Sequence, residues 1–292
     1  MSDITIGLLH PGEMGAAVGR CLVRAGHAVL WSPDGRSGAT TARADAAGLT
    51  AAEGLADLIR RADVIMSICP PHAALDVAHQ VAGSGAQEAA PAGQEAGFGG
   101  IFVDANAISP DTARKVAAIV EAGGAGYVDG GIIGAPPAAA GHTRLYLSGP
   151  QAGQVRQLFE GTALDTRIVG RDAPVGAASA VKMAYASWTK GTAALLLAAR
   201  GLARAEGVED VLLAEWALSQ PGLADRSAQA AGSAAVKGWR WIAEMEEIAA
   251  AMGAAGLPEG FHQAAAEIYR RSPDRGATSL DAVLAALLSP RP

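Results

Sequence analysis

A glycine-containing turn near the start of the chain carries the first residues that could do chemistry. It reads Gly7-Leu8-Leu9-His10-Pro11-Gly12-Glu13-Met14-Gly15 and joins an apolar run to an amphipathic stretch. A dinucleotide-binding turn needs glycine where the chain bends, where backbone approaches a pyrophosphate and where helix packs on strand. Gly12 and Gly15 occupy the second and third positions, and His10 occupies the first. The turn therefore predicts nucleotide binding through His10, Pro11, Gly12, Glu13 and Met14. The alternatives are a tight turn without a ligand and, for His10, a turn residue only.

A second group of polar residues follows the strand expected over residues 28–31. An acid near this point favours NAD, whereas a nearby arginine accommodates the extra phosphate of NADP. The sequence contains both, as Asp34 and as Arg36 with Ser37. Asp34 could accept from a ribose diol, and Arg36 with the Ser37 hydroxyl could bind a 2′-phosphate at the start of the next helix. We predict NADP as the cofactor, with NAD as the alternative.

The two cysteines, Cys21 and Cys69, are too few for a disulfide framework or a four-ligand zinc site. We expect reduced, buried thiols, as in a cytosolic protein. Cys69 and Pro70 directly follow the strand expected over residues 64–68, and they complete the predicted cofactor-binding residues.

Short apolar runs alternate with amphipathic stretches through residues 1–150, which is typical of βαβ units and a largely parallel sheet. We expect strands at residues 4–9, 28–31, 64–68, 101–103, 127–128 and 143–147, a short element at residue 50, and helices at residues 14–25, 38–47 and 55–61 and from Ser109-Pro110 onward. The stretch from residue 83 to 100 lacks periodicity and is expected to be a functionally silent surface insertion.

A long helix is expected over residues 177–205, where no proline occurs. The rest of the chain has a helical pattern, with helices expected at residues 209–218, 227–236, 239–255, 261–270 and 280–288. The predicted fold class is therefore α/β: a doubly wound, Rossmann-type domain over residues 1–170, a long interdomain helix, and an all-α domain within residues 171–292.

Composition excludes several classes of partner. Among 292 residues, 23 Lys+Arg against 29 Asp+Glu give a net charge of −6. Neutralising nucleic-acid phosphates needs a basic face, which an acidic chain without basic clusters does not provide. No segment offers the roughly 18 consecutive apolar residues of a membrane helix, and the first residues do not resemble a signal peptide. We expect a cytoplasmic protein that binds a small molecule, with no nucleic-acid or membrane partner.

Three motifs resemble the β-hydroxyacid dehydrogenase superfamily, which includes 3-hydroxyisobutyrate and 6-phosphogluconate dehydrogenases and is related to imine reductases. IGLLHPGEMG matches the family start G-x-x-G-x-G-x-M-G except at one glycine. Asp104-Ala105-Asn106-Ala107-Ile108-Ser109-Pro110 keeps both ends of D-x-S-T-x-S-P, and the segment 176–186 corresponds to G-x-G-x-x-x-K-x-x-N-N. More closely, the chain resembles the branch labelled as NAD-binding phosphogluconate dehydrogenases, which has a short, distinctive helical C-terminal domain.

The resemblance implies catalytic roles for Lys182, Tyr185 and Asn106. Lys182 would handle the proton of the substrate hydroxyl, and burial between domains can lower the pKa of a lysine into a useful range. Tyr185, three residues on and on the same helical face, could share that proton. Asn106 could hydrogen-bond substrate or nicotinamide. The alternatives are a solvated lysine, a tyrosine that only packs, and an asparagine that only fixes a turn.

The chain departs from the family pattern around these positions. Tyr185 and Ala186 replace paired asparagines, and Ile133 replaces a serine in the carboxylate-binding stretch 129–135, whose glycines are expected to form a substrate turn. Thr189 stands where 6-phosphogluconate dehydrogenases have a proton-donating glutamate, so we do not expect 6-phosphogluconate chemistry.

The helical domain offers weaker signals. Trp239 and Trp241 are two positions apart, so they diverge on a helix and cannot form one stacked wall. We expect one to pack in the core and the other to border the cleft. Arg240 is expected at the surface, with an anion-binding role as the alternative, His262 in the core or at an interface, and residues 244–247 on a solvated face. The resemblance also implies a homodimer formed through helical domains.

These observations favour an NADP-dependent dehydrogenase or reductase acting on a small alcohol or carbonyl. The alternatives are a reductase for imines or for carbonyls that lack a carboxylate, and a dinucleotide-binding protein without turnover.

Overall fold

The computed structural model describes residues 4–83, 97–273 and 279–289. By its internal contacts the chain divides into two compact units, Met1–Lys182 and Met183–Pro292. This division falls inside a long helix, whereas the sequence places a boundary at residues 170 and 171, before that helix. Most of the expected insertion at residues 83–100 lies outside the described residues, which resume at residue 97.

The first unit is built on an eight-stranded sheet with the order β3-β2-β1-β4-β5-β6-β7-β8. The strands are β1 Thr5–Leu9, β2 Ala28–Trp31, β3 Thr50–Ala51, β4 Val64–Ser67, β5 Ile101–Asp104, β6 Gly126–Ile133, β7 Thr143–Ser148 and β8 Leu164–Ile168. Every neighbouring pair is parallel except β6 with β7. The chain moves outward from β1 in one direction and then from β4 in the other, so the expected Rossmann-type, doubly wound domain is confirmed.

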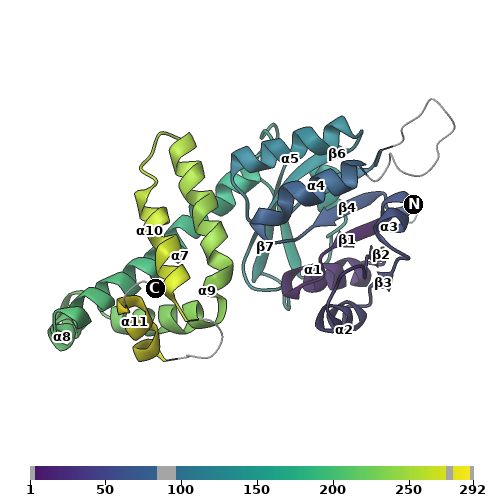
Figure 1. The fold of residues 1–292 in the computed structure, drawn as a ribbon. Helices are drawn as coiled ribbons and strands as arrows, with labels where there is room; N and C mark the ends of the chain where they lie inside the picture. The colour runs from purple at the N-terminus through teal and green to yellow at the C-terminus, as the bar shows by residue number, and fades with distance from the viewer. Residues whose placement is uncertain (1–3, 84–96, 274–278, 290–292) are drawn as a thin grey trace. The chain divides into compact units, whose positions relative to one another are not determined.

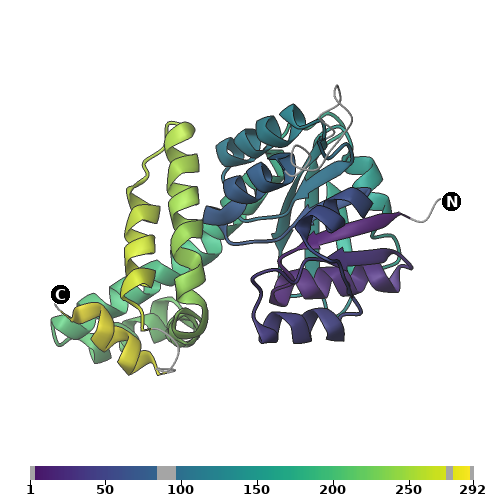
Figure 2. The same ribbon diagram turned by 45° about the vertical axis from the view of Figure 1, so that its right-hand side comes forward.

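Helices cover both faces of this sheet (Figures 1 and 2). They are α1 Glu13–Arg24, α2 Gly38–Ala46, α3 Leu55–Arg61, the short 3-10 helix η1 Pro71–Ala73, α4 Ala74–Gly83, α5 Pro110–Ala122 and α6 Ala152–Gln157. One core joins the sheet to α1 and α6, and a second joins it to α3, α4 and α5. Two-sided coverage explains why the central strands are continuous apolar runs in the sequence.

Local sequence signals account for some element boundaries and not for others. The Ser109 hydroxyl caps α5 by accepting from the Thr112 amide at 3.2 Å, and Pro110 takes the first helical position, as the sequence indicates. The short helix α6 and the edge strand β8 were not expected. Only the first residue of β8 is fully buried, so this strand lacks an apolar run.

The second unit contains the later part of α7 Ala177–Ala205 together with α8 Glu209–Ser219, α9 Leu223–Ala254, α10 Gly260–Arg271 and α11 Leu280–Leu288. Helices α9 and α10 run side by side (Figures 1 and 2). The expectation of two helices at 227–236 and 239–255 is wrong, because α9 is continuous. Gly238 is buried in its interior close to the Tyr269 ring, so packing overcomes the low helix propensity of glycine.

The expectation that residues 244–247 form a solvated face is also wrong. Met245 and Glu244 are buried, and the Glu244 carboxylate pairs with Lys190 on α7. Glu246 does face solvent and pairs with Arg270 at 2.8 Å. A 32-residue helix that packs on several neighbours leaves only part of its circumference to water. Within the described residues, no helix is long and apolar enough to cross a membrane.

Candidate functional site

Four neighbouring parallel strands are in register at the carboxyl-terminal side of the sheet, and their aligned residues form one row. Leu9 at the end of β1 pairs with Ser67 of β4, Ser67 pairs with Asp104 of β5, and Asp104 pairs with Asp129 of β6. Loops after the carboxyl ends of parallel strands form the ligand-binding crevice of doubly wound sheets. The turn after β1 and the loops after β4 and β5 leave the sheet here, and β6 continues beyond the row.

The turn after β1 is shaped by backbone contacts. His10 adopts a left-handed conformation with φ 66°, and its carbonyl accepts from the Gly12 amide at 2.7 Å. A Cβ at Gly15 would lie 2.6 Å from the His10 carbonyl oxygen, so only glycine lets α1 start this close to the turn. A Cβ at Gly12 would meet nothing within 4 Å, so space is open beside the amides that begin α1. Such amides bind phosphate through hydrogen bonds and the helix dipole.

The other turn residues offer backbone rather than side-chain groups to a ligand. Pro11 is buried, and Met14 is half-buried and packs against the core that joins the sheet to α1 and α6. Glu13 is exposed in the first turn of α1, where a carboxylate favours the helix dipole and would disfavour an adjacent phosphate. Cofactor contact by these three residues stays a prediction that concerns their main-chain atoms.

A cavity of about 100 Å³ lies next to this turn at the end of β2. His10 and Arg36 line it together with Ser32 and Asp34. The Asp34 carboxylate accepts from the Ser32 hydroxyl at 3.1 Å and from the Leu55 amide at 3.2 Å, which fixes this acid at the start of α3. Burial and the positive charge of Arg36 lower the pKa of His10 to about 4, so its ring is neutral at pH 7.

Arg36 and Ser37 have different local roles. The Arg36 side chain is exposed and borders the cavity. The Ser37 hydroxyl caps α2 and accepts from the Thr40 amide at 3.3 Å. The start of α2 therefore lies directly after the arginine, which is the arrangement expected for a phosphate-binding corner.

Asn106 ties together the loops after β4 and β5. It is buried, its side-chain oxygen accepts from the Cys69 amide at 2.5 Å, and its side-chain nitrogen donates to the Ser67 hydroxyl at 3.2 Å. These bonds support the turn-fixing alternative, and contact with substrate or nicotinamide stays a prediction. Burial raises the pKa of the Cys69 thiol to about 12, which argues against a thiolate there, and Pro70 is exposed.

The start of α7 is anchored by a buried carboxylate. Asp129 accepts from the Ser179 amide at 3.0 Å, from the Ser179 hydroxyl at 2.6 Å and from the Ser148 hydroxyl at 2.9 Å. The Ser148 hydroxyl also accepts from the Ala178 amide at 3.0 Å. A negative charge at a helix N-terminus satisfies amides that have no intrahelical partner. Sequence reasoning missed both serines because they reach Asp129 from distant elements.

Two glycines of β6 let α7 pack closely on the sheet. Gly130 and Gly131 lie inside the strand, so their assignment to a substrate turn is wrong, and Gly134, with φ 125°, follows the strand end. A Cβ at Gly131 would lie 2.7 Å from the Ala178 carbonyl oxygen and 3.0 Å from the Lys182 Cβ. The glycine therefore places Lys182 beside the part of β6 that extends past the row of strand ends.

The residues around Lys182 differ in polarity and in solvent exposure. Lys182 is half-buried, whereas Ala186 and Ile133 are buried and apolar, so neither supplies the polar group of the family pattern. Tyr185, one helical turn after the lysine, is 48% exposed and therefore is not a core residue of the helical unit. Its part in proton transfer stays a prediction.

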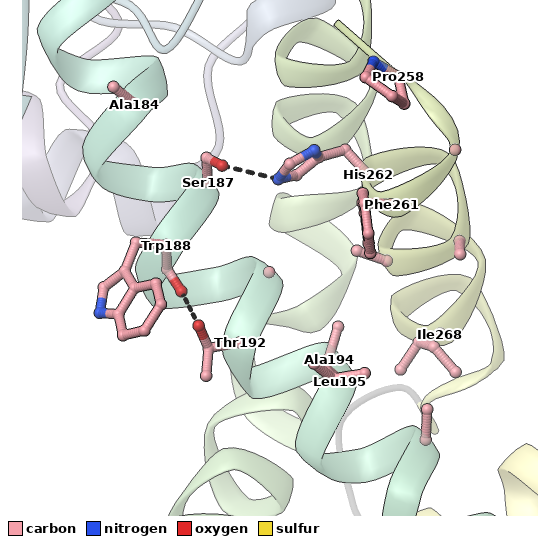
Figure 3. Close-up of a pocket in the computed structure, with 15 residues that line it drawn as sticks. Ala184, Ser187, Trp188, Thr192, Ala194, Leu195, Pro258, Phe261, His262 and Ile268 are labelled. Carbon is pink, nitrogen blue, oxygen red and sulfur yellow. Dashed lines mark hydrogen bonds between the residues drawn. The ribbon is translucent and has the colours of Figure 1, made fainter. Parts of the chain in front are cut away.

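The helical unit has an apolar groove between α7 and α10 with a volume of about 610 Å³ (Figure 3). His262 lies in its wall, and its Nε2 is 2.9 Å from the Ser187 hydroxyl oxygen. His262 is buried, which confirms the expectation of a core or interface histidine. Trp188 and Phe261 border the groove and are 70% and 76% exposed.

The two tryptophans of α9 diverge as predicted. Trp241 packs edge-to-face on Tyr269 with ring centroids 5.1 Å apart, and the Lys190 ammonium lies 5.4 Å from its ring centroid. Trp239 is exposed, and the Arg240 guanidinium lies 5.0 Å from its ring centroid at the surface.

Comparison with known proteins agrees with the arrangement of the first unit. The family described as the NAD binding domain of 6-phosphogluconate dehydrogenase matches residues 5–169. The chain belongs to this family. Residues 203–272 match a domain of unknown function, DUF1932. The first unit is therefore an NAD(P)-binding domain, and the helical unit contains a domain to which its family description assigns no function.

Individual relatives show the extent of the likeness. An uncharacterized 28.5 kDa protein of Methanothermus fervidus is 30% identical over 183 residues, which cover 61% of this chain and 63% of that protein. The match thus spans less than two thirds of that relative. A solved protein of unknown function, described as structurally similar to 3-hydroxyacid dehydrogenases, is 25% identical with a TM-score of 0.66 and covers 98% of this chain and 100% of its own.

Two solved enzymes share the fold along the whole chain. The 3-hydroxyisobutyrate dehydrogenase of Mycobacterium tuberculosis, solved with L-serine, is 22% identical with a TM-score of 0.68 and covers 98% of this chain and 99% of its own. An imine reductase from Myxococcus stipitatus, solved with NAD+, is 21% identical with a TM-score of 0.56 and covers 99% of this chain and 100% of its own.

Proposed function

We propose that this protein is an NADP-dependent oxidoreductase that interconverts an alcohol and a carbonyl on a small molecule, with β-hydroxy acids as the first substrate class to test. One observation carries the proposal. The turn that contains Gly12, with open space beside it, directly follows the carboxyl end of β1. Close packing at Gly131 places Lys182 at the same carboxyl-terminal side of the sheet. A dinucleotide-binding turn and a proton-transferring amine are the two parts that hydride transfer to or from a hydroxyl carbon requires.

The residues present fit a dinucleotide. The space beside Gly12 and the first amides of α1 would hold the pyrophosphate. Arg36 and the start of α2 would bind the 2′-phosphate through charge-assisted hydrogen bonds, whereas Asp34 would favour the ribose diol of NAD. When bound, the nicotinamide supplies or accepts the hydride. Against a net charge of −6, these local groups must supply the attraction for phosphate.

Lys182 would exchange the proton of the substrate oxygen. As a carbinol carbon gives up hydride, the hydroxyl loses its proton to the lysine amine, and the ammonium returns a proton in the reverse direction. Tyr185 would share that proton, and Asn106 would orient the substrate or the nicotinamide amide. The Asp129 bonds to the first turn of α7 hold the helix that carries the lysine.

The decisive experiment compares Lys182→Ala with wild type on a panel of hydroxy acids, carbonyls and imines, followed by nicotinamide absorbance. The matched control is Lys115→Ala, which removes an exposed lysine from α5. We expect Lys182→Ala to lose a hundredfold or more in kcat, about the contribution of a general acid or base, and the control to stay near wild type. Equal rates for Lys182→Ala and wild type on any accepted substrate contradict the assignment.

A second candidate function is reduction of an imine or of a carbonyl that lacks a carboxylate. Ile133 and Ala186 are apolar and buried where the family pattern has polar groups, so the carboxylate-binding set is incomplete. Faster turnover of imines than of hydroxy acids in the same panel supports this alternative. A non-catalytic dinucleotide-binding protein is the third possibility, and the retained Lys182 argues against it.

We also propose a cytoplasmic homodimer formed through the helical units. The groove and its exposed aromatic rims leave an apolar face on α7 and α10, and soluble monomers rarely expose large apolar patches. A second copy of the helical unit would cover this face. The acidic net charge supports the expectation that nucleic acid is not a partner.

A further inference from the structure

His10 places a titratable ring at the corner that sets cofactor preference. It stands where the family pattern has a glycine, and it lines the cavity of about 100 Å³ together with Arg36, Ser32 and Asp34. A glycine would leave this part of the cavity without a polar side chain from the turn after β1. The substitution therefore brings an imidazole next to the arginine that is proposed to bind the 2′-phosphate.

Two features of His10 lower the stability of the folded protein. Its φ of 66° is a left-handed backbone conformation that glycine adopts freely and that is strained for residues with a Cβ. Its Nδ1 atom is buried and has no hydrogen-bond partner among the described residues. Burying a polar atom without a partner is unfavourable. A partner that arrives with a ligand would offset both costs.

The charges around the ring decide how it would respond to a phosphate. Among the described residues, the charged residues of the cavity wall are Arg36 and Asp34. The uncharged ones besides His10 are Leu9, Ser32, Leu55, Val77, Gln80 and Val81. Burial and Arg36 hold the pKa of His10 near 4. A phosphate dianion at this corner would offset the charge of Arg36 and attract an imidazolium.

We propose that His10 is a specificity-determining residue of the cofactor site: with Arg36 it binds the 2′-phosphate of NADP, and its ring takes up a proton as that phosphate binds. The inference rests on the proposed function. NAD lacks the phosphate and would bind without this proton uptake. Because the pKa of the ring is raised by binding, the affinity for NADP rises as pH falls from neutral toward the pKa of the free protein, and the affinity for NAD does not follow.

The test is calorimetric titration of wild type and His10→Asn with NADP+ and NAD+ at pH 5.5, in two buffers of different ionisation enthalpy. Asparagine tolerates a positive φ and keeps a hydrogen-bonding side chain, but it does not titrate. The phosphate, whose second pKa is near 6, titrates in both proteins and is coupled to the ring only in wild type, so the sign of the difference in proton uptake, rather than its size, reports the ring. Thermal unfolding confirms that the variant is folded.

We expect wild type to take up more protons than His10→Asn with NADP+, and the two proteins to agree with NAD+. Relative to the variant, wild type should gain about tenfold in its preference for NADP+ over NAD+ between pH 7.5 and pH 5.5. Equal proton uptake by both proteins with NADP+, or the same excess with NAD+, overturns the inference. If neither dinucleotide binds, the proposed function itself fails.

Discussion

At the scale of single residues, the two glycines of the turn after β1, where we propose that the pyrophosphate binds, have different surroundings. Gly12 has an ordinary φ of −68° and open space beside it, whereas a Cβ at Gly15 would collide with the His10 carbonyl. Gly12→Ala should therefore fold normally and lose cofactor affinity, because the new methyl group occupies the space for the pyrophosphate. Gly15→Ala should lose both stability, by about 1–3 kcal/mol, and cofactor affinity, because the helix start must shift.

Thermal unfolding and titration with NADP+ separate the two effects. Gly153→Ala serves as a control, because a Cβ there meets nothing within 4 Å and the position lies in α6, outside the proposed cofactor site. Unchanged cofactor affinity in Gly12→Ala would show that the pyrophosphate does not lie beside this residue.

At the scale of elements, one carboxylate links the helices of the second unit. Glu209 at the start of α8 accepts from Arg200 at 3.0 Å and from Arg204 at 2.7 Å, and Arg204 also pairs with Asp281 of α11 at 2.7 Å. These two arginines hold the pKa of Glu209 low, at about 2. Arg200 is buried and also donates to Ser227 of α9 at 2.9 Å.

Glu209→Gln should destabilise the protein at neutral pH by about 2 kcal/mol or more, because it leaves the buried Arg200 without its carboxylate. A carboxyl group whose folded pKa is depressed stabilises the fold above its unfolded pKa, and this contribution is lost as pH falls toward the folded value. The difference in free energy of unfolding between wild type and Glu209→Gln should therefore decrease from pH 6 to pH 3. Urea unfolding at both pH values measures this difference, with Asp210→Asn, which removes an exposed carboxylate from the same turn of α8, as control. A difference that stays constant with pH contradicts the assignment.

Sequence patterns predicted the elements that depend on local signals and missed those that depend on distant contacts. The apolar runs of β1 and β4 and the Ser109 cap are local, so the Rossmann-type domain could be predicted. The same holds for Gly12 and Gly15, whose spacing alone defines the turn. The Asp129 anchor of α7 joins residues far apart in the chain, and β8 lacks an apolar run, so neither has a local signature.

At the scale of the whole molecule, an exposed apolar stripe on α7 indicates how copies would associate. Trp188, Leu195 and Leu202 are spaced seven residues apart, and they are 70%, 64% and 65% exposed. Side chains at this spacing share one face of a helix, and such a seam normally packs against another helix. Within the described residues, Trp188 and Leu195 of this stripe line the groove between α7 and α10, and all three side chains are open to solvent.

Leu195→Glu should convert the proposed dimer into a monomer, because a second copy of the stripe cannot bury a carboxylate without a partner. Sedimentation velocity at micromolar concentration measures the change. Ile168→Glu is the matched control, since Ile168 is an exposed apolar residue on β8 of the first unit and lies far from the stripe in sequence. Wild type and the control should sediment as dimers and Leu195→Glu as a monomer. A monomeric wild type contradicts the dimer, and a dimeric Leu195→Glu places the interface elsewhere than on this face of α7.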